Sequence, residues 1–182
     1  MKNLISILII STILSCCSKD TNVLGNAGND QLPAETQIGA NTVGCLVNGK
    51  VFLPKAEGIN PEVNCFYQLV DGEYYFSMNF ADLRGTGFKE VFVQTRKTNL
   101  NAGQIYTLNK NSIDNGDYIG SSGGHSTSLS NNYYTNTTKI GELKITKLDL
   151  TNSIISGIFW FDAENATGEK VEIRQGRFDW RY

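Results

Sequence analysis

Apolar and polar residues alternate along much of the chain from about residue 43 to the C-terminus. The segment Glu73–Phe80 shows this best, because Tyr74, Phe76, Met78 and Phe80 fall on one side and polar residues dominate the other. A period of two predicts a strand with one buried face.

Similar patterns predict further strands, at 45–47, 50–53, 64–70, 90–95, 104–108, 133–138, 141–150, 154–164, 170–174 and 176–182. Asn48-Gly49 and Asp71-Gly72 predict tight hairpin turns. Residues 109–132 are dominated by Asn, Asp, Ser and Gly, which predicts a long exposed loop with a short strand at 118–119.

No segment of helical length carries an apolar stripe with a 3.6-residue period. We therefore predict an all-β domain of roughly eight to ten strands, arranged as an antiparallel two-sheet β-sandwich. The spacing of the strands is also compatible with a partly closed β-barrel, which remains the alternative.

The N-terminus has the pattern of an export signal. Lys2 precedes an apolar run from Leu4 to Leu14 that is too short to span a membrane, and Ser15 stands directly before Cys16. We predict a lipoprotein signal peptide at 1–15, cleavage before Cys16 (alternatively Cys17) and lipidation of the new terminal cysteine. Residues 16–40 then form a lipidated flexible tether, and residues 41–182 form one all-β domain.

The balance of charge is mild. The chain has 16 Lys and Arg against 18 Asp and Glu, which gives a formal net charge of −2. A nucleic-acid partner is not expected, since such proteins cluster basic residues on one face. The acyl chains are the expected membrane contact, and we predict a lipid-anchored protein of the outer membrane, either surface-exposed or facing the periplasm.

Two stretches resemble a domain-of-unknown-function family of Bacteroidetes lipoproteins. They are Leu32-Pro33-Ala34-Glu35-Thr36-Gln37-x-Gly39-x-Asn41-Thr42-x-Gly44-Cys45-x-x-Asn48-Gly49 and a C-terminal half that includes Gly141-x-Leu143-x-Ile145-Thr146-x-x-Asp149, Ile155-Ser156-Gly157-x-Phe159 and Gly176-x-Phe178. The resemblance implies an envelope location and supplies no activity. Acidic residues just past the lipid-bearing cysteine can direct such proteins to the cell surface, and Asp20 is the one acid close to it here.

Cys45 and Cys65 lie in the predicted domain and can pair in an exported protein. A disulfide closing a loop of about 20 residues would contribute on the order of 3 kcal/mol. The alternative is two buried free thiols. Zinc is not expected, because the chain has no Cys-x-x-Cys pair and His125 is its one histidine.

Candidate catalytic and metal-binding residues have simpler explanations. His125 lies in a Ser/Gly-rich stretch without a Gly-x-Ser-x-Gly elbow, and we interpret it as a surface-loop residue. Asp114-Asn115-Gly116-Asp117 offers oxygen ligands of the kind calcium takes, but it lacks the bidentate glutamate of an EF-hand, and turn formation explains the same residues without a metal. The scattered acids cannot be paired from sequence, so we predict no catalytic residues, no metal and no cofactor; these acids are Glu73, Asp82, Glu90, Asp162, Glu164 and Glu172.

The aromatic residues are the better indication of function. Tyr133 and Tyr134 lie beside the polar segment and, because neighbours in a strand point opposite ways, are the pair that we expect to be exposed. With Tyr118 they form the candidate ligand-binding set, since exposed Tyr flanked by amides suits glycans and protein interfaces. We predict a non-enzymatic module that binds a glycan, peptide or protein. A structural accessory of an outer-membrane complex is the first alternative, and a hydrolase is the second.

Overall fold

The computed structural model describes residues 31–84, 87–113 and 117–182. The described residues form no helix, which confirms the all-β prediction. They therefore contain no helix long and apolar enough to cross a bilayer. Their eleven strands are β1 (Thr42–Val47), β2 (Lys50–Phe52), β3 (Val63–Val70), β4 (Glu73–Asp82), β5 (Lys89–Arg96), β6 (Ile105–Leu108), β7 (Gly120–Ser128), β8 (Asn131–Tyr134), β9 (Gly141–Asp149), β10 (Ile154–Glu164) and β11 (Lys170–Arg181).

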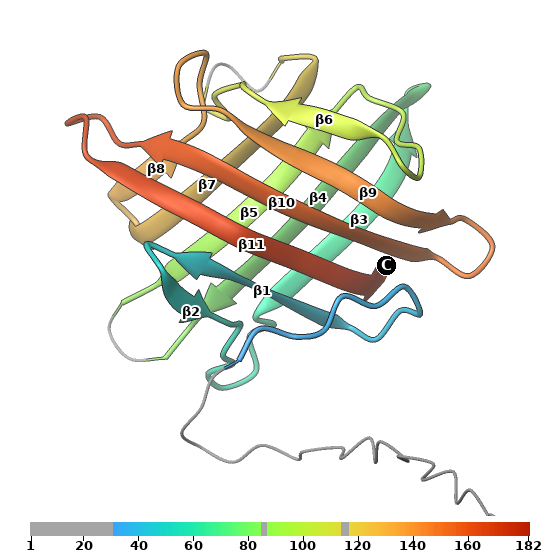
Figure 1. Ribbon diagram of the computed structural model, residues 1–182, viewed down its shortest axis with the longest axis horizontal. Coiled ribbons are helices and arrows are strands. Elements are labelled where there is room, and N and C mark those ends of the chain that lie inside the picture. The colour runs from blue at the N-terminus through green and yellow to red at the C-terminus, as the bar shows by residue number, and fades with distance from the viewer. Residues whose placement is uncertain (1–30, 85–86, 114–116) are drawn as a thin grey trace, which may run out of the picture.

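The strands form one hydrogen-bonded sheet in the order β2-β1-β11-β10-β9-β6-β7-β5-β4-β3. The sheet folds back on itself, so that β1, β11, β10 and β9 form one layer in front of a second layer of β7, β5, β4 and β3 (Figure 1). Strand β8 pairs with β7 and with β10, so hydrogen bonds also join the two layers along one side. The pair β6–β7 is parallel, which makes the sheet mixed rather than wholly antiparallel as predicted.

Alternating side chains from both layers meet in one hydrophobic core. Phe76 and Phe80 of β4 are buried, and their rings lie 5.7 Å from that of Phe178 and 6.4 Å from that of Phe159 on the facing layer. Met78 between them is also buried. The predicted inward face of this strand is therefore confirmed.

Both predicted hairpin turns are present. Asn48 and Gly49 connect β1 to β2 with φ values of 48° and 77°, and Asp71 and Gly72 connect β3 to β4 with 51° and 83°. Two consecutive residues with positive φ are what a type I′ turn requires, and Asn-Gly and Asp-Gly supply them at low cost.

Part of the predicted tether lies against the domain. Backbone amides of Ile38, Gly39 and Ala40 donate to the Asp179 carboxylate of β11, and Arg177 donates to the Pro33 carbonyl at 3.4 Å. The rest of the predicted tether, the signal peptide, Cys16 and Cys17 lie outside the described residues.

The prediction of a long exposed loop over 109–132 is wrong in its second half. Strand β7 occupies 120–128 between β5 and β8, and its residues 121–126 are buried. Small residues are required here because a Cβ at Gly123 would lie 2.8 Å from Phe161, and one at Gly124 would lie 2.4 Å from Phe92. The Ser/Gly composition that indicates a loop in the sequence thus makes room for two large neighbours.

The interpretation of His125 as a surface residue is also wrong. It lies in β7 with its side chain on the inward face, opposite Val91 of β5, and is 4% exposed.

The possible disulfide is not formed. Cys45 of β1 is a buried free thiol and Cys65 of β3 is a half-buried one. They belong to different layers, and each packs among the apolar residues of the core. Cys45 and Cys65 are therefore two free thiols that act as small apolar groups, which is the alternative given in the sequence analysis.

Candidate functional site

Strand β8 places the two predicted tyrosines on opposite sides. It runs between β7 and β10, with Tyr133 opposite His125 and Tyr134 opposite Gly124. Tyr133 points inward and is 4% exposed, whereas Tyr134 points outward and is half-buried. The expected exposure therefore holds for Tyr134 alone, and each tyrosine lines a different pocket.

Tyr134 lines a pocket of about 400 Å³, which we name the amide pocket. Its walls come from the segments around β8, from the end of β10 and from the turn that follows β10; the lining residues are Asn111, Ile113, Ser130, Asn131, Asn132, Tyr134, Asn136, Glu164, Asn165, Ala166 and Thr167.

Several of these amides fix the pocket walls. The Asn136 side-chain oxygen accepts the backbone N–H of Thr138 at 2.7 Å, and its nitrogen donates to Glu164 at 2.9 Å. The Asn165 oxygen accepts the backbone N–H groups of Thr167 and Glu169 at 3.1 and 2.9 Å. Such local side-chain bonds hold the turns in one conformation, so the pocket is preformed.

Tyr134 is paired with a second aromatic residue that the sequence analysis did not single out. The ring of Phe92, on β5, lies 6.3 Å from the Tyr134 ring at an interplanar angle of 54°. Gly124 lies between these two residues in the sheet and leaves space for the Phe92 ring. The sequence carried no signal for this close approach, because the Ser and Gly residues around Gly124 show no apolar pattern.

The hydroxyl group of Tyr134 forms no hydrogen bond within the described part of the chain. Burial raises the pKa of this phenol, and the nearby Glu90 carboxylate raises it further, so the group stays protonated. It can therefore both donate to and accept from a ligand.

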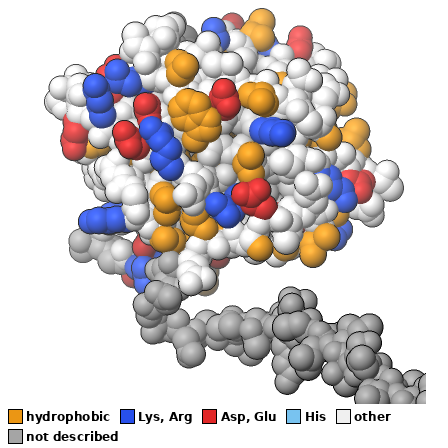
Figure 2. All heavy atoms as spheres, in the orientation of Figure 1, with side chains coloured by type: hydrophobic (Ala, Val, Ile, Leu, Met, Phe, Trp, Pro, Cys, Tyr) orange, Lys and Arg blue, Asp and Glu red, His pale blue; other side chains and the backbone are white. Residues whose placement is uncertain are grey.

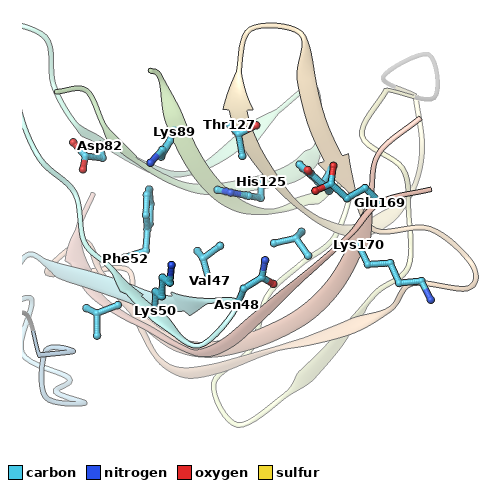
Figure 3. Close-up of a pocket in the computed structure, with 13 residues that line it drawn as sticks. Val47, Asn48, Lys50, Phe52, Asp82, Lys89, His125, Thr127, Glu169 and Lys170 are labelled. Carbon is cyan, nitrogen blue, oxygen red and sulfur yellow. The ribbon is translucent and has the colours of Figure 1, made fainter. Parts of the chain in front are cut away.

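Tyr133 lines a second pocket of about 430 Å³, which we name the interlayer pocket (Figure 3). It lies between the two layers, with walls from the β1–β2 hairpin, the adjoining ends of β4 and β5, strands β7 and β8, and the start of β11; the lining residues are Val47, Asn48, Lys50, Val51, Phe52, Asp82, Lys89, His125, Thr127, Tyr133, Glu169, Lys170 and Val171.

A chain of polar side chains separates the two pockets. Asn165 donates to Asn131 at 3.0 Å and to Glu169 at 3.2 Å, and Asn131 donates to the Tyr133 hydroxyl at 3.3 Å. Asn131 begins β8 and Asn165 lies in the turn after β10, 34 positions away, and their contact could not be predicted from the sequence.

Within the interlayer pocket, Nδ1 of His125 lies 2.7 Å from the backbone carbonyl oxygen of Glu90. A carbonyl only accepts, so Nδ1 carries the proton and donates it. Burial lowers the pKa of His125 more than this bond raises it, which keeps the imidazole neutral.

Tyr118 belongs to neither pocket. Its hydroxyl lies 2.6 Å from both Gln94 Nε2 and Ser122 Oγ, and the Arg96 guanidinium lies 5.4 Å from its ring centre. These contacts hold Tyr118 on the outer surface of β5 and β7 and account for its position without a ligand. The structure thus brings Tyr133 and Tyr134 to one strand and leaves Tyr118 apart from them.

Of the acids considered for hydrolysis, Asp162 and Glu172 lie opposite each other on β10 and β11, and Arg174 contacts both, at 2.5 and 3.8 Å. Asp162 faces outward on the front layer, whereas Glu90 faces outward on the opposite layer. The front layer shows interspersed acidic and basic side chains (Figure 2), as a solvated sheet face does. No group of three His, Cys, Asp or Glu residues that could hold a metal lies within residues 31–84, 87–113 and 117–182, and residues 114–116 of the calcium-like sequence lie outside them.

Fold and pockets together define a two-layered all-β domain with preformed pockets at one end. A family model described as "Domain of unknown function (DUF6252)" matches residues 83–179, and the chain belongs to this family. The matched region runs from just after β4 almost to the end of β11 and contains β8 and Phe92. No curated protein and no solved structure matches the chain.

Proposed function

We propose that this protein is a lipid-anchored envelope protein that binds a glycan in the amide pocket and does not act on it as an enzyme. The observation that carries the proposal is the position of Tyr134. Its half-exposed ring and unpaired hydroxyl line a pocket whose other polar groups are mainly amides. Aromatic rings can stack on the C–H faces of sugars, and amides bind their hydroxyl groups.

The polar groups around Tyr134 favour a neutral or weakly charged sugar over a peptide. The carboxylate in the lining is Glu164, which already accepts from Asn136 and lies 3.7 Å from the Lys139 ammonium group. A pocket without a free charge gives little electrostatic attraction to a charged partner. It suits a ligand that presents many hydroxyl groups.

We further propose that Cys16 carries the acyl chains, in line with the resemblance to Bacteroidetes lipoproteins. Protease shaving of intact cells tests the location, with a Cys16→Ala, Cys17→Ala protein as the unanchored control. Loss of the protein from intact cells supports a surface location. Protection until the outer membrane is broken supports a periplasmic one and directs the search to periplasmic glycans.

A glycan array tests the binding function, followed by calorimetric titration of the strongest ligand. We expect Tyr134→Ala to weaken binding about tenfold or more, because stacking and a hydrogen bond are lost together. Tyr134→Phe keeps the ring and should lose less. Tyr75→Ala, on the outward face of β4, is the matched control and should bind as the wild type does.

Two results would count against the glycan proposal. One is the absence of any ligand on an array that includes bacterial, mucin and plant glycans. The other is a ligand whose affinity is the same for the wild type and Tyr134→Ala, which would place the binding site elsewhere.

One observation favours the alternative of an assembly accessory. Strand β3 ends the sheet, and its last residues Leu69 and Val70 are 58% and 46% exposed. An open strand with exposed apolar residues can pair with a strand of another protein. Native electrophoresis of solubilised membranes would test this, since Leu69→Lys should then release the protein from a larger complex.

A further inference from the structure

The interlayer pocket has an apolar lining that the proposed glycan site does not use. Val47, Val51 and Val171 line it together with the ring of Phe52. The Phe52 ring packs edge-on against the His125 ring, with 6.1 Å between centres and an interplanar angle of 80°. An apolar surface between two layers favours the non-polar body of a small molecule.

His125 adds one hydrogen-bond acceptor to this apolar lining. Its ring projects into the pocket between Phe52 and Thr127 (Figure 3). Because Nδ1 donates to the Glu90 carbonyl, Nε2 carries a lone pair, and it has no hydrogen-bond partner among the described residues. A neutral imidazole nitrogen of this kind accepts a hydrogen bond from a ligand hydroxyl group.

The charged residues of the pocket leave a positive excess beside the apolar lining. Arg84 binds both oxygens of Asp82 at 3.0 Å and offsets its charge, which leaves the Glu169 carboxylate against three lysines in the lining. Lys50 and Lys89 lie on either side of Phe52 (Figure 3), and neither forms an ion pair within the described residues. Lys170 also lines the pocket, but its side chain extends away from it (Figure 3).

From these three features we infer that the interlayer pocket binds a small carboxylate with an apolar body and a hydroxyl group. The carboxylate lies against Lys50 and Lys89, the apolar body packs on Phe52 and the valines, and the hydroxyl donates to Nε2 of His125. This site lies on the other side of β8 from the amide pocket, and it does not depend on the glycan function.

The only histidine of the chain gives a direct test. The probes are 4-hydroxyphenylacetate for an aromatic ligand and 3-hydroxydecanoate for an aliphatic one, titrated into purified protein with ¹⁵N-labelled histidine. At least one probe should shift the Nε2 resonance of His125. Phenylacetate, which lacks the hydroxyl, and 4-hydroxyphenethyl alcohol, which lacks the carboxylate, should each bind more weakly than 4-hydroxyphenylacetate.

Matched variants separate the contacts. Lys50→Met and Lys89→Met should each weaken binding about three- to tenfold, as expected for one partly exposed ionic contact. Lys170→Met is the control and should bind as the wild type does. Tyr134→Ala should also leave binding unchanged, so that failure of the glycan proposal and failure of this one are distinguishable.

The inference is overturned if neither probe shifts the His125 resonance at millimolar concentration. It is also overturned if a probe binds but Lys50→Met and Lys89→Met both retain the wild-type affinity. In that case the positive excess at Phe52 does not select the ligand.

Discussion

The Thr36 hydroxyl donates a hydrogen bond of 2.6 Å to the carboxylate of Asp179, across 143 positions of sequence. The same carboxylate accepts three backbone N–H groups, from Ile38, Gly39 and Ala40, and the hydroxyl of Ser156. One side chain near the C-terminus therefore holds the segment that enters the domain. In Figure 1 this N-terminal segment and the C-terminus lie side by side.

Replacing Asp179 with Asn should destabilise the domain more than a typical surface substitution. The side chain is 1% exposed, and an amide cannot accept all five hydrogen bonds that the carboxylate accepts. We expect the free energy of unfolding to fall by about 2–4 kcal/mol, measured by urea denaturation. Asp149→Asn, at the end of β9 where the carboxylate accepts exposed N–H groups of the following turn, is the control and should cost about 1 kcal/mol or less. Equal losses in the two variants would contradict the role of Asp179.

The same carboxylate should make stability depend on pH in the acid range. Burial tends to raise the pKa of Asp179, but the bonds from Thr36, Ile38, Ser156 and Ala40 outweigh it and lower the pKa to about 2. In the unfolded chain the value returns to about 3.8. Between these values the unfolded state binds more protons, so the contribution is complete above pH 3.8 and is lost as the pH falls through 2.

The comparison of wild type with Asp179→Asn isolates this effect from other acids whose pKa is lowered, such as Asp82 and Asp149. The difference in unfolding free energy between the two proteins should shrink by up to about 2 kcal/mol between pH 5 and pH 2. Urea denaturation at a series of pH values measures it. A difference that stays constant over this range would show that Asp179 titrates normally in the folded protein.

The strands that bury alternate side chains could be predicted from the sequence, because their period is visible in one segment. Glu73–Phe80 is an example. The two hairpin turns could also be predicted, because Asn-Gly and Asp-Gly are local signals. Strand β7 could not, because Ser and Gly at 121–124 carry no apolar pattern and their need for small size depends on Phe92 and Phe161. The pockets were hidden for a related reason, since their walls join turns such as 48–50 and 165–169 that no local pattern connects.

Gly124 offers a test of the close packing beneath the candidate glycan site. A Cβ there would lie 2.4 Å from Phe92 and 3.0 Å from the Tyr133 carbonyl oxygen. Gly124→Ala should cost roughly 1–3 kcal/mol of stability and, by displacing Phe92 from Tyr134, should weaken glycan binding as well. Thermal unfolding and calorimetric titration measure the two effects.

The matched control for this substitution is Gly87→Ala. Among the described residues, no atom beyond its chain neighbours lies within 4 Å of a Cβ at Gly87, so the change should stay within about 0.5 kcal/mol of the wild type. If Gly124→Ala were as mild as Gly87→Ala, the Phe92 ring would have room to move and would not be fixed beside Tyr134.

The two thiols of the domain should be inert in the folded protein. Burial raises the pKa of Cys65 to about 12 and raises that of Cys45 well above its ordinary value, so almost no thiolate forms at pH 8. Since the thiolate is the reactive species, iodoacetamide should leave both residues unmodified in the native protein and alkylate both in concentrated urea. Mass spectrometry measures the number of alkylated cysteines. The Cys16→Ala, Cys17→Ala protein is used so that the N-terminal cysteines do not contribute. A native mass lower by two hydrogens that reducing agent restores would instead reveal a disulfide between Cys45 and Cys65, and it would require β1 and β3 to move toward each other.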